Sequence, residues 1–129
     1  MRYLGVDYGR ARIGIAVSDP EGKIAFPDRV ITRRGIRQVI AEFEKIFGEK
    51  EIGAIVAGLP LGLAGGETQE TEEVRAFTAR LETALRIPIH FENEIFTTRM
   101  AEAHGKGKMS DASAAAIILQ SYLDKKNKP

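Results

Sequence analysis

The 129-residue sequence contains no cysteine, which excludes disulfide bonds and thiolate metal ligands. It has only two histidines, His90 and His104, so a zinc site would need an unusually large share of carboxylate ligands. We therefore expect any metal ion bound by this chain to be a hard ion that prefers oxygen ligands.

Long apolar runs are also missing. No segment approaches the roughly 20 apolar residues that a membrane-spanning helix needs. The first seven residues, Met1 to Asp7, lack the apolar stretch of a signal peptide. The sequence thus predicts a cytoplasmic protein that does not engage a membrane.

The composition is that of an ordinary globular domain, with 43% hydrophobic and 29% charged residues. A chain of this length has room for one well-filled core. We expect a single domain over residues 1–125 and a flexible basic tail over 126–129. The net charge of +1 does not by itself favour a nucleic-acid partner.

Hydrophobic patterning predicts five strands. Two β-branched runs separated by Gly9-Arg10-Ala11 are typical of an antiparallel pair. Pro27 must lie at an edge or a bulge, because proline donates no hydrogen bond to a neighbouring strand. The predicted strands cover residues 2–8, 12–18, 23–31 and 52–57, with a fifth beginning at 87; the glycine-rich stretch 58–66 is predicted to be a loop.

Four helices complete the pattern. The first follows Gly35 and ends at Gly48, and the second is capped by Thr68 and stopped by Pro88. A short third helix runs from about residue 97 to 104, and the last follows a cap at Ser110. The order βββαβαβαα predicts an α/β domain with a mixed five-stranded sheet flanked by helices.

Three acidic residues stand where strands end or a helix begins. Asp7 ends a strand that should be central, where a charge needs a cation or donors, although Asp7 can equally cap the Gly9 turn. Glu94 follows the fifth strand on the same side as Glu92, and solvent exposure explains both equally well. Asp111 opens the last helix, where the helix dipole alone accounts for it.

Taken together, the three acids indicate more than each does alone. Strand ends and a helix start can converge at one edge of a sheet, and converging carboxylates repel unless cations lie between them. Two magnesium ions held in this way can activate a water and stabilise the departing oxygen of a phosphodiester.

At this point the sequence resembles the YqgF family, also called RuvX, relatives of the RuvC Holliday junction resolvases in the RNase H-like superfamily. The resemblance covers nearly the whole chain and is carried by motifs in the expected order. These motifs are Leu4-Gly5-Val6-Asp7-Tyr8-Gly9, Arg12-Ile13-Gly14-Ile15-Ala16-Val17-Ser18-Asp19, Val56-Ala57-Gly58-Leu59-Pro60-Leu61, Phe96-Thr97-Thr98, Asp111-Ala112-Ser113-Ala114-Ala115 and Ile118-Leu119-Gln120-Ser121-Tyr122-Leu123.

The resemblance implies an RNase H-like fold and a site supported by Mg²⁺ or Mn²⁺, with Asp7, Glu94 and Asp111 as both the catalytic and the metal-binding residues. It implies a nuclease that matures the 5′ end of the pre-16S ribosomal RNA. The partners implied are nucleic acid, structured RNA ahead of branched DNA, and the ribosome precursor. A resolvase-like DNA endonuclease is the alternative, and the oligomeric state, monomer or homodimer, stays open.

The sequence departs from the family pattern beside these acids. Asn93 and Ile95 flank Glu94 where the family commonly has aspartate and arginine, and Ala114 stands where RuvC-like relatives bring a fourth acid. These changes favour weaker metal or phosphate binding, and they keep open a second alternative, a nucleic-acid-binding module with weakened catalysis.

Further residues are candidates for phosphate contacts, although ordinary surface charge explains each of the basic ones. They are Arg10, Arg12, Arg99, Lys106 and Lys108, together with the backbone N–H groups of Gly58 and Gly62. Tyr8 can stack on a base or pack over the turn. The strand-Asp-x-Gly-turn pattern also resembles actin-like ATPases and sugar kinases, but these need two such domains.

Overall fold

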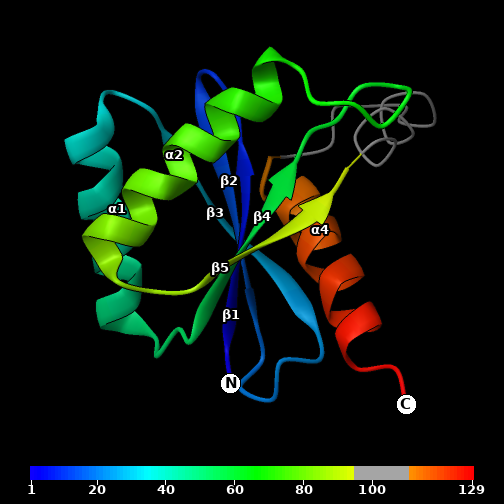
Figure 1. Ribbon diagram of the computed structural model, residues 1–129. Helices are drawn as coiled ribbons and strands as arrows, with labels where there is room; N and C mark the ends of the chain where they lie inside the picture. The colour runs from blue at the N-terminus through cyan, green and yellow to red at the C-terminus, as the bar shows by residue number, and fades with distance from the viewer. Residues whose placement is uncertain (95–110) are drawn as a thin grey trace.

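The computed structural model describes residues 1–94 and 111–129 (Figure 1). A five-stranded sheet has the order β3-β2-β1-β4-β5. Neighbours among the first three strands are antiparallel, whereas β4 pairs parallel to β1 and β5 parallel to β4. The described elements are β1 (Tyr3–Tyr8), β2 (Arg12–Ser18), β3 (Ala25–Thr32), α1 (Ile36–Glu49), β4 (Ala54–Leu59), α2 (Gln69–Leu85), β5 (Ile89–Asn93) and α4 (Asp111–Lys126). The predicted mixed sheet is confirmed.

The sheet separates two helical layers, with α1 and α2 on one face and α4 on the other (Figure 1). Side chains of β1 alternate between these faces. Leu4 and Val6 pack with the residues of α1 and α2, whereas Tyr3 packs with those of α4. Asp7 follows Tyr3 in this alternation, so its side chain lies on the face covered by α4.

Glycines let α4 lie directly on the backbone of the central strands. A Cβ atom on Gly14 would be 1.9 Å from the carbonyl oxygen of Asp111, and one on Gly5 would be 2.8 Å from Cβ of Leu119. Such distances are impossible for real side chains. The glycines therefore bring the first turn of α4 against the end of β1.

Two predicted features of the chain's turns and caps are confirmed. Pro27 lies in the edge strand β3, beside a register shift at Ile15 and Ala16 of β2. Thr68 caps α2 in a reciprocal capping box with Thr71. The helix ends at Leu85, ahead of Pro88, with the next residue in the left-handed region.

Other predicted boundaries are corrected. Strand β4 continues through Gly58 to Leu59, so the loop begins at Pro60. The first helix passes Gly48 and ends at Glu49. The last helix includes Lys126, and Asn127 donates to the carbonyl of Gly22 at 3.0 Å, so the predicted tail is anchored further than expected. The predicted helix at 97–104 and the Ser110 cap lie outside the described residues.

Over residues 1–94 and 111–129, no helix is both long and apolar enough to cross a membrane.

Candidate active site

Asp7 lies at the carboxyl end of the central strand, opposite Gly14 of β2. Burial raises the pKa of Asp7 to about 6, and the negative charge of Asp111 adds to this shift. The turn that follows is closed by the Gly9 N–H, which donates to the carbonyl of Arg12 at 2.9 Å. Because backbone atoms close this turn, the carboxylate of Asp7 is not needed to cap it. The carboxylate lies on the α4 face of the sheet.

Asp111 is the first residue of α4, and its carboxylate is partly exposed. Because its backbone rests against Gly14, the side chain starts beside the end of β1. The Nε atom of Arg12 lies 3.0 Å from Oδ2 of Asp111. Arg12, predicted as a phosphate contact, therefore forms an ion pair with one of the three acids.

Glu94 follows β5 directly, and its N–H donates to the carbonyl of Leu59 at 3.1 Å. Its carboxylate lies over Gly58, where a Cβ atom would be 2.9 Å from Oε2. That buried oxygen has no hydrogen-bond partner among the described residues. Burial, followed by the charge of Asp7, raises the pKa of Glu94 to about 8.

The three acids thus gather on the α4 face of the sheet, where Asp7 interacts electrostatically with both of the others. Their oxygens suit a hard divalent cation, and the unpartnered oxygen of Glu94 lacks the donor that a buried carboxylate needs. As placed, however, the described residues contain no group of three acidic, histidine or cysteine side chains arranged around one ion. The acids thus have the oxygen ligands and the shared face that a cation site needs, but the described side chains do not converge on one ion position.

Of the remaining basic residues predicted to contact nucleic acid, the structure describes the surroundings of one. Arg10 lies 3.8 Å from Glu73 and 4.0 Å from Glu70 of α2, so acids already neighbour it. Arg99, Lys106 and Lys108 lie outside the described residues.

The two predicted glycine contacts stay predictions, and the structure shows what surrounds each glycine. Gly58 belongs to β4, where its missing side chain leaves space for Glu94 rather than for a phosphate. The N–H of Gly62 donates to the carbonyl of Gly66 at 2.8 Å, so this donor is used within the loop.

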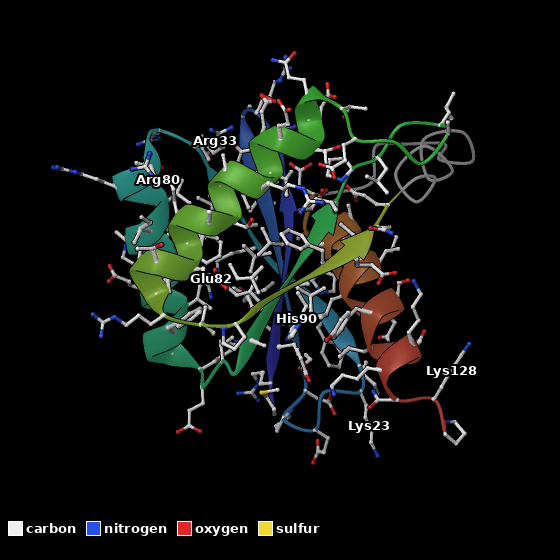
Figure 2. All side chains as sticks on the ribbon, in the orientation of Figure 1. Lys23, Arg33, Arg80, Glu82, His90 and Lys128 are labelled. Carbon is white, nitrogen blue, oxygen red and sulfur yellow. The ribbon has the colours of Figure 1, made fainter. Side chains whose placement is uncertain are left out.

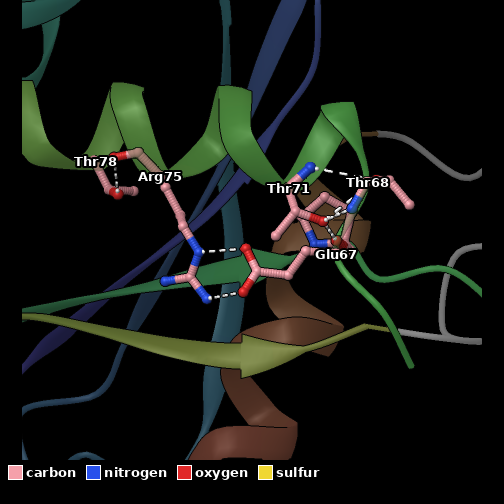
Figure 3. Close-up of polar contacts among 6 residues, drawn as sticks. Glu67, Thr68, Thr71, Arg75 and Thr78 are labelled. Carbon is pink, nitrogen blue, oxygen red and sulfur yellow. Dashed lines mark hydrogen bonds and ion pairs between the residues drawn. The ribbon is translucent and has the colours of Figure 1, made fainter.

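Side chains of α2 hold both ends of the loop between β4 and α2 (Figure 3). Thr71 donates its hydroxyl to the carbonyl of Pro60. Arg75 donates to both carboxylate oxygens of Glu67, at 2.9 and 3.1 Å. The loop is therefore held onto α2 rather than being a loose connector.

Glu92 is a residue that sequence reasoning left undecided. It lies on the α4 face, as alternation with Glu94 predicts, but it is buried, with 6% exposure. Its Oε2 accepts hydrogen bonds from Ser121 and Lys125 of α4, both at 2.6 Å. The spacing of these two partners, one helical turn apart, was the available signal that they share a face. Glu92 thus joins α4 to β5, next to Glu94.

Two of the three departures beside the acids can be located, whereas Ile95 lies outside the described residues. Asn93 is exposed, and alternation directs it away from the face that holds Glu92 and Glu94. Asn93 therefore points to the other side of β5 from Glu92 and Glu94. Ala114 is half-buried on α4, in the turn after Asp111, and brings no ligand.

Comparison with solved structures defines the class of protein. The chain superposes on the Thermus thermophilus RuvC structure with a TM-score of 0.63 at 14% identity, covering 98% of this chain and 96% of that one. The shared fold is that of an RNase H-like domain.

Sequence comparison gives the family. A protein from Maridesulfovibrio salexigens named "Putative pre-16S rRNA nuclease" is 37% identical over 95% of this chain and 98% of its own length. The model of the RuvX family, described as "Holliday junction resolvase", matches residues 1–125. The chain belongs to the RuvX family and is a nuclease.

The sugar-kinase alternative has a structural basis but not a sequence one. A ROK family protein from Streptococcus pneumoniae superposes with a TM-score of 0.51 at 19% identity, and this chain covers 39% of it. The likeness is one of fold over part of the larger chain, and the family match decides against that alternative.

Proposed function

We propose that this nuclease depends on Mg²⁺ or Mn²⁺ held by Asp7, Glu94 and Asp111. The observation that carries the proposal is the gathering of three carboxylates on one face, with a buried oxygen of Glu94 left without a partner in the described part of the chain. Burying such charges is costly unless a cation offsets them.

Bound divalent ions supply an activated water and stabilise the departing oxygen of a phosphodiester. The chain's own residues position the three carboxylates. Gly58 leaves room for the Glu94 carboxylate, and Gly14 lets the first turn of α4 carry Asp111 up to Asp7. Arg12 is exposed beside Asp111, where its guanidinium can bind and orient a phosphate of the substrate.

The proposed substrate is the 5′ extension of the pre-16S ribosomal RNA, within a ribosome precursor in the cytoplasm. The relative at 37% identity, named for that activity, supports RNA as the substrate. Branched DNA is the second candidate, because the family description names Holliday junctions. Such a protein can act as a monomer or a homodimer.

A cleavage assay tests the proposal. The purified protein is incubated with a pre-16S 5′ fragment, single-stranded RNA and a four-way DNA junction, with Mn²⁺, Mg²⁺ or EDTA. We expect metal-dependent cleavage that is strongest on the precursor RNA. Cleavage that persists in EDTA, or none on any substrate, would contradict the proposal.

The alternative of a binding module without catalysis makes a different prediction for Asp7→Asn. As a nuclease, this variant should lose at least about 100-fold in cleavage rate while binding RNA as the wild type does, because one ligand of the proposed metal site is lost and the surface stays. A binding module would show no cleavage to lose. Gel-shift measurements at fixed salt separate the two outcomes.

A further inference from the structure

A cavity of about 270 Å³ lies between α1 and α2, on the face of the sheet opposite the three acids. Tyr8 lines it, and Tyr8 directly follows Asp7 along β1. Because successive side chains of a strand point to opposite faces, the cavity and the acidic site share the end of β1. Its volume is slightly below the roughly 300–1,000 Å³ typical of small-molecule sites, which suits a ligand as small as one nucleotide.

A stack of three side chains forms one wall of the cavity. The rings of Tyr8 and Phe77 have centroids 4.4 Å apart, and the guanidinium of Arg33 lies 4.6 Å from the centroid of Tyr8. Both contacts of Tyr8 are internal to the protein, so the packing alternative for this residue is confirmed. Arg33, rather than Tyr8, is the outer member of the stack.

Hydrogen bonds to the β1–β2 turn fix the guanidinium of Arg33. Its Nη1 atom donates to the carbonyls of Gly9 at 2.9 Å and Arg10 at 2.7 Å, both in the β1–β2 turn. A planar guanidinium fixed in this way offers a flat cationic surface without further loss of side-chain freedom. Nucleic-acid bases stack on such surfaces.

Helix α2 also contributes to the cavity a cation that has no partner among the described residues. Arg80 of α2 lines the cavity, is exposed, and forms no hydrogen bond or ion pair with the described residues. Figure 2 labels Arg33 and Arg80 on the side of the molecule where α1 and α2 lie. Glu73 also lines the cavity, but its carboxylate is 3.8 Å from Arg10 outside it. The lining charges therefore favour an anion.

We infer that this cavity binds one nucleotide of the nucleic-acid strand, with the base on the Arg33 guanidinium and the phosphate on Arg80. The inference rests on the proposed function for its ligand class, since a strand that left the acids over the β1–β2 turn would reach this face. It adds a second contact with the substrate, away from the carboxylates.

The test uses full-length Asp7→Asn protein in EDTA, so that binding is measured without cleavage. Adenosine 5′-monophosphate, adenosine and inorganic phosphate are titrated separately while the backbone amide resonances of Gly35 and Ala76, which line the cavity, are followed by NMR. We expect the nucleotide to shift these resonances and to bind more tightly than either of its parts. Equal weak binding of phosphate alone would identify a mere anion site and overturn the inference.

Two cavity variants should change the affinity in opposite directions. Arg80→Ala should weaken nucleotide binding roughly tenfold, the size of one lost charge-assisted hydrogen bond. Glu73→Gln should strengthen it by about two- to fivefold, because a like charge is removed. Lys128→Ala, which removes the same charge as Arg80→Ala far from α2, is the matched control (Figure 2) and should change nothing.

If Arg80→Ala and Lys128→Ala behave alike, or if Glu73→Gln fails to strengthen binding, the cavity is not the site. Such a result leaves the proposed function standing, because that depends on metal-dependent cleavage by the wild type. If the wild type shows no metal-dependent cleavage but the cavity binds the nucleotide, the proposed function fails and the nucleotide site stands.

Discussion

At the residue scale, the raised pKa values of Asp7 and Glu94 predict how stability depends on pH. Their values in the folded chain, about 6 and about 8, exceed the ordinary 3.8 and 4.5 of the unfolded chain. The folded protein therefore keeps protons that the unfolded chain releases. The stabilisation of the folded state by these bound protons is fully present below about pH 4. It is lost as the pH rises through 6 and then 8.

In EDTA, the melting temperature should accordingly contain a component that falls between pH 4 and pH 8. Each unit of pKa shift corresponds to about 1.4 kcal/mol, so the two groups together cost a few kcal/mol at neutral pH. Melting curves of the wild type and of Asp7→Asn with Glu94→Gln test this. The double variant should show a flatter profile, and parallel profiles would contradict the assignment of the effect to these acids.

Arg12 predicts a second effect at this scale. Its guanidinium occupies an oxygen of Asp111 at 3.0 Å, so a cation approaching Asp111 must compete with it. Exposed ion pairs contribute about 0–1 kcal/mol, so Arg12→Ala should tighten Mn²⁺ binding by up to about fivefold. The variant should nevertheless cleave more slowly, because the proposed phosphate contact of Arg12 is lost.

Arg10→Ala is the matched control for Arg12, because it removes the same charge from the same turn. Arg10 lies near Glu70 and Glu73 rather than near Asp111. Its removal should leave Mn²⁺ affinity unchanged in a calorimetric titration. Equal changes of Mn²⁺ affinity in the two variants would mean that Arg12 acts only through the net charge of the protein and not through its ion pair with Asp111.

At the scale of elements, the site depends on how closely α4 approaches the sheet. Gly14→Ala places a methyl group where the Asp111 carbonyl now lies, 1.9 Å from the new atom, so α4 must move. Overpacking of this kind costs roughly 1–3 kcal/mol or more. We expect a lower melting temperature. We also expect a slower cleavage rate at temperatures where the variant is still folded.

Gly48→Ala is the control for this substitution. Gly48 is within α1, and a Cβ atom there meets nothing within 4 Å. Alanine is also favoured over glycine inside a helix, so this variant should be slightly stabilised and fully active. If Gly14→Ala cleaves RNA at the wild-type rate, the close packing of α4 is not needed for the site.

The sequence was sufficient to predict the order of the elements that the structure describes, but not their contacts across the sheet. Strand and helix order followed from local periodicity, and the Thr68 cap from the residue type. Gly58 was misplaced in a loop because its role is tertiary: it makes room for Glu94 within β4. The burial of Glu92 was likewise invisible, since it depends on the register of α4 against β5.

The candidate acids show the same division. Position made Asp7, Glu94 and Asp111 candidates, and motif resemblance joined them into one set. The ion pair of Arg12 with Asp111 could not be predicted, because both residues have other partners available at a strand end and a helix start.

At the scale of the whole molecule, the sheet separates the two faces that we propose contact the substrate, and these faces share one end of β1. The carboxylates lie beneath α4, and the arginine-lined cavity lies between α1 and α2. A nucleic-acid strand crossing the β1–β2 turn would contact both faces. Substrate affinity should therefore depend on residues of both faces, whereas metal affinity should depend on the α4 face alone.

Direct measurement of Mn²⁺ binding tests the central claim, that Asp7, Glu94 and Asp111 hold the metal. Titration of the wild type followed by electron paramagnetic resonance should show saturable binding. Asp7→Asn, Glu94→Gln and Asp111→Asn should each weaken it at least about tenfold, since each removes one anionic ligand. Folded variants that bind Mn²⁺ as tightly as the wild type would contradict the claim.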